Sequence, residues 1–514
     1  MNFSEISTCR CLPVWAAVLV SFLSGAAEAA RTDGRLEISV VDSETGQAVP
    51  ARIHLRDSRG RPVRSRGWGI APLGDHAYVD GSAKLDLRRG QYEFDLDAGP
   101  EYLSQRGNFE IVRHAGDSKT IEVRRFVNLQ KEGWYAGDLD VRRDAAELAI
   151  PMQAEQLAYL PTIAWERIDE MEWKPAIASR RTPGNDASDG LTSTRGPFAH
   201  FFTNPGNRLL LIRESAPFEP LTESTTVSSV DLISTERAEE DMHIIAVSPF
   251  ERSFPIWLAT GKLDAVLLLN RHSLRDGVVD NETDGRKRDV SMFPGKTGNG
   301  RWGEAIYYHA LNAGLRLPPA AGSGSGANDN PIGANRVYVQ CGQEFDAASW
   351  WHGLSAGNVV VTNGPLLRPS VEGQPPGYVF RIKDGQKIDL AVSLNLATRT
   401  PISYLEIVKN GVADQQVEIA SLAKSKGKLP PVSFDDSGWF LVRAVTNRAD
   451  KFEMASTGPY YVEKNGQPRI SRRSVQFFLD WLDEEEPRTT PAERPAFAAA
   501  REFWQSRLAM ANAE

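Results

Sequence analysis

The chain alternates between segments with a strand-like pattern and segments with a helix-like pattern. Residues 35–128 contain alternating apolar and polar runs, which are RLEISVVD, ARIHL and KLDLRRGQYEFDLD. A period of two, interrupted by Ser-Glu-Thr-Gly and Arg-Gly turns, is typical of half-buried strands. The pattern therefore predicts an all-β domain at residues 30–128.

Residues 129–365 show short apolar runs interleaved with helix candidates. We expect strands at GDLDV, RLLLI, MHIIAV, LDAVLLL and ANRVYVQ, and helices at residues 145–160, around residues 257–261 and at residues 304–313. This alternation favours an α/β domain, in which loops at the strand ends are available for a site. Residues 178–207 and 318–335 are rich in small and polar residues and predict long loops, either functional or mobile.

The last part of the chain changes pattern twice. Residues 366–468 again predict strands, with a hairpin at Asn410-Gly411, because this pair suits a tight turn between alternating runs. Residues 469–514 predict two amphipathic helices. Their apolar stripes are Val475, Phe478, Leu479 and Leu482, then Phe497, Ala500, Trp504 and Leu508. The expected fold class is a multi-domain α/β plus all-β protein, with a β-sandwich at 30–128, an α/β domain at 129–365, a second β-sandwich at 366–468 and C-terminal helices at 469–514.

The first 29 residues predict an export signal. Arg10 precedes an apolar run at residues 12–25, and Ala27-Glu28-Ala29 places small residues where a signal peptidase reads them. We expect cleavage after Ala29 and export of the mature chain to the periplasm or the exterior; the alternative is an uncleaved anchor. No other apolar run approaches membrane length, so no transmembrane segment is expected in the mature chain.

Composition narrows the function classes. The 514 residues carry a formal net charge of −8, with 3 cysteines and 8 histidines. The hydrophobic and charged fractions are those of a globular protein, and the acidic balance argues against nucleic acid as the main partner. Removal of the signal leaves only Cys341, which excludes an internal disulfide in the mature chain. The small number of histidines limits any metal site.

The segment GWYAGDLDVRRDAAELAIPMQAEQLAYLPTIAW, residues 133–165, resembles the CehA/McbA-type metallohydrolases of the PHP (polymerase and histidinol phosphatase) superfamily. The resemblance continues through LDAVLLLNRHSLRDG, GNGRWGEAIYYHALNAG and VVVTNGPLLRPSVEG. It implies a distorted α/β barrel and metal-dependent hydrolysis of amides, carbamates or phosphate esters. Residues 35–128 similarly resemble the prealbumin-like β-sandwich of carboxypeptidase regulatory domains, which implies a structural or docking role.

The chain departs from this family at three ligand elements. Where the family carries Gly-Asp-Leu-His-Val-His, the two histidine positions hold Asp140 and Arg142. A carboxylate still binds a hard cation, but a guanidinium has no lone pair to offer. Residues 162–165 (TIAW) replace Thr-Asp-His, and residues 322–326 (GSGSG) replace Gly-Ser-Asp-x-His. A multi-metal centre is therefore not expected, and no metal ligand or cofactor is assigned; a rearranged site for one divalent metal belongs to the alternative function below.

The candidate site residues fall into two groups. The candidate catalytic residues are Asp138, Asp140 and His272, as the base or the ligands that would polarise a water molecule. The candidate binding residues are Arg142, Arg143, Glu155, Asp276, Ser323 and Ser325, the two serines because their glycine-rich loop offers N–H groups to an anion.

Two of these residues have alternative interpretations. Arg142 either pairs with Asp138, Asp140 or Glu155 in place of the metal, or is solvated or salt-bridged at the surface. His272 either serves as a general acid or base near Asp276 or Asp280, or is a hydrogen-bonded structural histidine.

Two functions remain open. The first is a non-catalytic descendant, a pseudoenzyme that binds a small molecule in the inherited pocket or a cell-surface partner through its β-domains. The second is an active hydrolase with a rearranged single-metal or metal-free site. The substitutions at three ligand elements favour the first.

Overall fold

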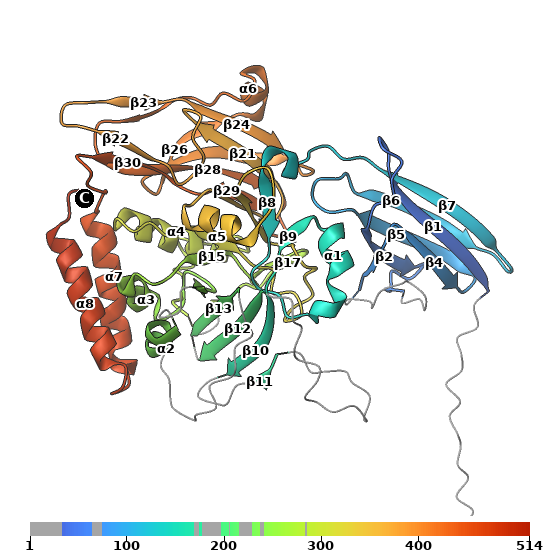
Figure 1. Cartoon of the computed structure of the whole chain (residues 1–514), viewed down its shortest axis with the longest axis horizontal. Helices are drawn as coiled ribbons and strands as arrows, with labels where there is room; N and C mark the ends of the chain where they lie inside the picture. The colour runs from blue at the N-terminus through green and yellow to red at the C-terminus, as the bar shows by residue number, and fades with distance from the viewer. Residues whose placement is uncertain are drawn as a thin grey trace, which may run out of the picture.

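The computed structural model describes residues 33–63, 75–168, 174–176, 197–204, 206–214, 229–236, 241–282 and 285–514. The predicted export signal lies outside these residues. The described chain has a mixed α/β fold with several β-sheets (Figure 1). None of its described helices is long and apolar enough to cross a membrane.

The N-terminal strands form two sheets that share one apolar core, as their alternating pattern predicts. That core contains Leu36 and Ile38 from one sheet and Ile53 and Leu55 from the other, all at most 6% exposed. The first sheet has the order β4 (Ser82–Leu87), β1 (Gly34–Asp42), β7 (Gly116–Val123). The second has the order β3 (Ala77–Val79), β2 (Ala51–Asp57), β5 (Gly90–Asp97), β6 (Gln105–Ile111). These strands form the lobe at the right of Figure 1.

A seven-stranded sheet carries much of the central core. Its order is β11 (Lys174–Pro175), β10 (Thr162–Ile168), β12 (Phe198–Asn204), β13 (Asn207–Arg213), β14 (Met242–Ala246), β15 (Ala265–Leu269), β18 (Pro319–Ala321). A short hairpin, β16 (Ser273–Leu274) with β17 (Gly277–Val278), follows β15.

The loop predicted at residues 178–207 is wrong at its end, where β12 lies. The strand forms because Ala199, Phe201 and Phe202 are buried while the backbone pairs with both β10 and β13. Residues 178–196 of that predicted loop lie outside the described residues. The second predicted loop, at 318–335, contains β18 and is otherwise irregular.

A ten-stranded sheet joins the centre of the chain to its C-terminal part. Its main order is β22 (Val379–Ile382), β30 (Tyr460–Lys464), β28 (Gly438–Thr446), β29 (Met454–Thr457), β20 (Val359–Thr362), β19 (Arg336–Gln340), β8 (Trp134–Gly137), β9 (Leu157–Tyr159), and the hairpin β25 (Ile402–Lys409)–β26 (Val412–Val417) pairs with β28. Because β20 pairs with β29, the sheet runs without a break across residue 365, where we predicted a domain boundary.

The hairpin predicted at Asn410-Gly411 is confirmed. It joins β25 to β26, and both turn residues have a positive φ, 51° and 86°. Two further pairs complete the strands, β21 (Leu366–Val371) with β24 (Val392–Ala397) and β23 (Ile388–Leu390) with β27 (Val432–Phe434).

The described helices are α1 (Ala149–Ala154), α2 (Ser229–Glu236), α3 (Phe254–Thr260), α4 (Gly298–Asn312), α5 (Ala347–Ser355), α6 (Ile419–Lys424), α7 (Arg472–Glu485) and α8 (Arg494–Ala509), with short 3₁₀ turns η1 (Gln130–Glu132), η2 (Ala145–Glu147) and η3 (Glu486–Arg488). The sequence pattern predicted α1, α3, α4, α7 and α8 at least in part, and it missed α2, α5 and α6. The predicted helices near 257–261 and 304–313 are α3 and α4.

The helix predicted at 145–160 is wrong beyond Ala154. Gln156 has a φ of +51°, which ends a right-handed helix, and the residues after it pair with β8 as strand β9. At the C-terminus the two predicted amphipathic helices are present and lie side by side (Figure 1), with the Phe478 and Trp504 rings 4.5 Å apart.

Candidate functional site

The first candidate residues follow the end of strand β8. We predicted a strand through residues 137–141, but regular pairing ends at Gly137, and Asp138 begins a buried irregular segment. The loop at 322–326 runs alongside it, since Leu139 N–H donates to Ala321 O and Arg142 N–H donates to Ser325 O. Gly322 permits this approach, because a Cβ there would lie 2.6 Å from the Asp140 Cβ. The two segments that the sequence analysis selected, residues 138–142 and 322–326, are therefore in contact.

Asp138 is fully buried and bound by backbone groups. Its Oδ1 accepts hydrogen bonds from the N–H groups of Ser323 (2.8 Å) and Asp140 (3.3 Å), and its Oδ2 accepts one from Gly333 (2.7 Å). Burial raises the pKa of Asp138 to about 7, while the bonds from Ser323 and Gly333 act in the opposite direction. The carboxyl group thus anchors two loops.

Asp140 lies between two guanidinium groups. Its Oδ2 is 3.4 Å from Arg271 Nη2, and its Oδ1 is 3.9 Å from Arg142 Nη2. Both guanidinium groups lie over the Phe201 ring, at 4.1 Å for Arg142 and 4.8 Å for Arg271. Since Asp140 is fully buried, these two cations compensate its negative charge.

The ion pair that we expected between Arg142 and a buried carboxylate is therefore shared by Arg142 and Arg271, which both lie near Asp140. Arg142 makes only a long ion pair with Asp140, and its Nε lies 2.8 Å from Glu166 Oε1. The hydrogen bond to Asp140 comes from Arg271, which the sequence analysis did not select. Arg271 directly precedes His272 and follows the end of β15, and this position could have marked it as a candidate site residue.

The serine loop is closed on itself rather than open to an anion. Ser323 and Ser325 are fully buried. The Ser323 N–H binds Asp138, and the Ser325 N–H donates to the Ser323 hydroxyl at 3.1 Å. Arg143 Nε donates to Ser325 Oγ at 3.3 Å. The backbone N–H groups of Ser323 and Ser325, which we expected to bind an anion, thus donate to groups of the protein itself.

His272 is buried behind this segment. Its ring Nδ1 lies 2.9 Å from Asn270 Oδ1, and its ring meets Phe250 edge-on at 5.2 Å. Burial lowers the pKa of His272 to about 3, and the positive charges of Arg208 and Arg271 act in the same direction. The imidazole is therefore neutral at physiological pH. Asp276, its suggested partner, is 63% exposed at the side chain and pairs with Arg275 at 2.5 Å.

Glu155 belongs to a second cluster. Its Oε1 accepts hydrogen bonds from Arg52 Nε (2.8 Å) and the Tyr78 hydroxyl (3.2 Å), and its Oε2 lies 3.3 Å from Arg336 Nη2. These contacts tie α1 to strand β2 and to the start of β19. The candidate residues therefore separate into a sealed group around Asp138 and Asp140 and a group containing Glu155 and Asp276.

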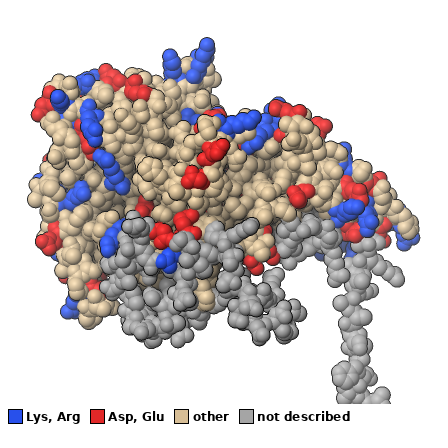
Figure 2. All heavy atoms as spheres, in the orientation of Figure 1, with Lys and Arg blue, Asp and Glu red and all other residues tan. Residues whose placement is uncertain are grey.

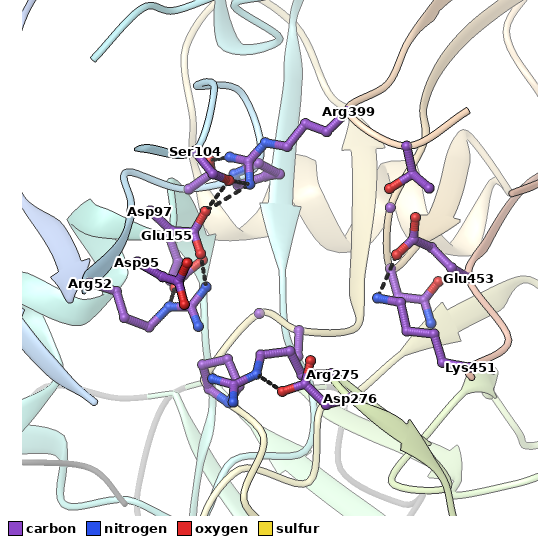
Figure 3. A pocket seen from close by; sticks show the side chains of 18 of the residues that line it. Arg52, Asp95, Asp97, Ser104, Glu155, Arg275, Asp276, Arg399, Lys451 and Glu453 are labelled. Atoms are coloured by element: carbon purple, nitrogen blue, oxygen red, sulfur yellow. Dashed lines mark hydrogen bonds and ion pairs between the residues drawn. The ribbon is translucent and has the colours of Figure 1, made fainter. Parts of the chain in front are cut away.

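The second group lines a cavity of about 350 Å³ (Figure 3). Its walls come from the N-terminal strands, the central domain and the C-terminal strands; we call it the interdomain cavity. Among the described residues that line it, eight are Arg or Lys and five are Asp or Glu. Gly333 lies between the groups, because it lines the cavity while its N–H binds Asp138. Sequence reasoning did not find this cavity, since its walls are far apart along the chain.

One described group of side chains has the composition of a metal site. His54 Nδ1 and His76 Nδ1 lie 3.4 and 3.2 Å from the Asp75 carboxylate. However, Arg275 places Nη1 2.8 Å from His54 Nε2 and Nη2 3.2 Å from Asp75, and Arg52 Nη1 is 3.1 Å from the same imidazole nitrogen. Two guanidinium groups this close oppose the entry of a cation. The residues present therefore do not fit a resident metal.

Compared with known proteins, the chain matches no family model, no curated protein and no solved structure.

Proposed function

We propose that this protein is an exported, non-catalytic ligand-binding descendant of CehA/McbA-type hydrolases of the PHP superfamily. The family assignment rests on the sequence resemblance of residues 133–373, and export rests on the signal-like residues 1–29. In this proposal residues 30–128 are a prealbumin-like domain, and the central domain keeps the PHP-type frame without its metal centre.

One observation carries the proposal. Asp140 is fully buried and lies against the guanidinium groups of Arg271 and Arg142, at 3.4 and 3.9 Å. Neither Asp138 nor Asp140 is among the residues that line the interdomain cavity. A hydrolase must bring water and substrate to its catalytic groups, whereas this arrangement fills the inherited position with protein cations.

The second candidate is a hydrolase with a relocated single metal. The His54, Asp75 and His76 group favours it, because its spacing suits a metal and His54 lines the interdomain cavity. Arg275 and Arg52 argue against it. This candidate and the first predict different metal contents.

Elemental analysis of the purified protein tests the proposal. We expect zinc, manganese and iron well below one atom per chain, and no hydrolysis of amide, carbamate or phosphate esters. Near-stoichiometric metal that is lost in Asp140→Ala would show that the inherited site still works. Metal that is lost in His76→Ala but kept in Asp140→Ala would establish the relocated site. Either result would overturn the proposal.

A further inference from the structure

We propose that the interdomain cavity binds a small oxyanion ligand, one carrying a carboxylate, sulfate or phosphate group. This inference gives the proposed ligand-binding function its site and ligand class, and it rests on that function for its biological meaning. It depends on the walls of the cavity and not on the sealed group at Asp138.

Charged side chains from three parts of the chain point toward one another across the cavity (Figure 3). The N-terminal strands contribute Arg52, Asp97 and Ser104, and the central domain contributes Arg275. From the C-terminal part, Arg399 reaches across to donate hydrogen bonds to Asp97 Oδ1 (3.0 Å) and Ser104 Oγ (2.8 Å). A ligand in the cavity would therefore contact the N-terminal, central and C-terminal parts of the chain at once.

The carboxylates of the cavity are already paired with cations. Asp97 lies 3.2 Å from Arg52 and 3.0 Å from Arg399. Asp95 lies 2.7 Å from Arg56 and 2.6 Å from Arg106. Asp95 and Asp97 are therefore each paired with two guanidinium groups, which compensate the negative charge of the carboxylate without a bound ligand.

The other described acids that line the cavity are also paired with cations, one or two each. Glu453 is 2.5 Å from Lys451, Asp276 is 2.5 Å from Arg275, and Glu155 is bound by Arg52 and Arg336. Their contacts make the lining carboxylates poor receptors for a cationic ligand, because such a ligand would have to displace an arginine or lysine.

The guanidinium groups, in contrast, keep hydrogen-bond donors. Each has five N–H groups, and an ion pair with one carboxylate uses one or two of them. Arg56 bonds Asp95 through Nη1 with its side chain 37% exposed. Arg448 bonds Asp450 through Nε and Nη2 with its side chain 38% exposed. These two residues are nearly 400 positions apart in the sequence and line one cavity. Their N–H groups that bond no described residue suit an oxyanion.

Size and polarity restrict the ligand further. A volume of about 350 Å³ accommodates a small molecule and not a folded partner. No Phe, Tyr or Trp is among the described residues that line it, and half of those residues are charged. On the face drawn in Figure 2, acidic and basic side chains are interspersed.

Isothermal titration of the full mature chain tests this inference. The probes are citrate and inorganic phosphate at millimolar concentration in 50 mM salt, with glucose and putrescine as neutral and cationic comparisons. We expect at least one anion to bind and to lose affinity at 500 mM salt. Arg56→Gln and Arg448→Gln should each weaken binding about tenfold or more, because a charge-assisted hydrogen bond is lost.

Arg35→Gln is the matched control, because Arg35 is 58% exposed, pairs with one aspartate and lies outside the cavity. Binding that is equal in all three variants would be a general salt effect and would overturn the inference. Binding of glucose or putrescine alone, or of no probe, would also overturn it. The proposed function is tested by metal content and hydrolytic activity, and neither is measured in this titration. A failure of the anion-binding inference is therefore distinguishable from a failure of the proposed function.

Discussion

Single residues decide what the candidate site is. A guanidinium at position 142 stands where the resembled family has an imidazole, and it can neither ligate a metal nor lose its proton. Arg271 adds a second cation beside Asp140, and Phe201 supports both. The site is thereby an internal ion-pair cluster, whose contribution is measurable as stability.

Substitution of Arg271 tests that cluster. Arg271→Met should destabilise the protein by about 2–4 kcal/mol, because among the described cations it leaves the buried Asp140 carboxylate with only the long contact to Arg142. Adding Asp140→Asn to this variant should restore part of the loss, which is the sign of direct coupling. Urea unfolding of the two single variants and the double variant measures the effect. Arg35→Met, at an exposed pair, should change stability little; additive losses would contradict the interpretation.

Asp138 predicts a pH dependence. Its pKa is about 7 in the folded protein and about 4 in an unfolded chain, so the folded state binds the extra proton between these values. Stability from this group is therefore present at low pH and falls by about 1.4 kcal/mol per unit as the pH rises from about 4 to about 7.

Comparison with Asp138→Asn isolates this contribution. The stability advantage of the wild type over the variant should shrink between pH 5 and pH 7, measured by urea unfolding at each pH. An advantage that grows with pH would mean that Asp138 is ionised in the folded protein and that its three N–H bonds outweigh burial.

At the scale of elements, two irregular loops matter more than the regular strands beside them. The loop at 322–326 follows residues 138–142 through backbone hydrogen bonds, and Gly333 fixes the next loop on Asp138. Arg142, Ser323 and Ser325 are positioned by this contact and not by a sheet. Two irregular segments can pack this closely only if glycine stands where the backbone of one approaches the other, as at Gly322 and Gly326.

Gly326 is the sharpest instance. It has a φ of +94°, and a Cβ there would overlap the carbonyl oxygen of Arg142. Gly326→Ala should destabilise the protein by about 2–5 kcal/mol through combined strain and overlap. Gly295→Ala is the control, with a φ of +69° and no atom within 4 Å, and should cost about 1–2 kcal/mol. Equal effects in thermal or urea unfolding would argue against close loop packing.

At the scale of the whole molecule, one sheet crosses the boundary that the pattern indicates at residue 365. The N-terminal strands have a core of their own. The central and C-terminal parts share the ten-stranded sheet, and one apolar cluster extends from Tyr135 to Trp504. We therefore expect the N-terminal unit to fold by itself and the central and C-terminal parts to depend on each other.

Fragments test this difference. A fragment of residues 30–126 should fold, with β-type circular dichroism and resistance to protease. A fragment of residues 366–514 should not, because it lacks β20 and exposes the apolar residues that pack against the centre. A stable, protease-resistant 366–514 fragment would show that the predicted boundary at residue 365 separates two independently folding units.

The sequence by itself determined many of the local elements and which residue types stand at positions 140 and 142. Period-two and helical patterns located the N-terminal strands, the Asn410-Gly411 hairpin, α3, α4 and the two C-terminal helices, because each of these is governed by local turn chemistry and one-sided burial. The same sequence indicated that Arg142 cannot ligate a metal. It misjudged residues 155–160 and 198–204, where a backbone turn and pairing with distant strands override local preference.

Only the tertiary structure decided which residues meet. Asp140 lies beside Arg271, 131 positions away, and Glu155 lies beside Arg52, 103 positions away. Such contacts depend on strand order and loop path, which no local pattern encodes. The interdomain cavity has the same origin, because its charged walls come from three parts of the chain that only the folded protein brings together.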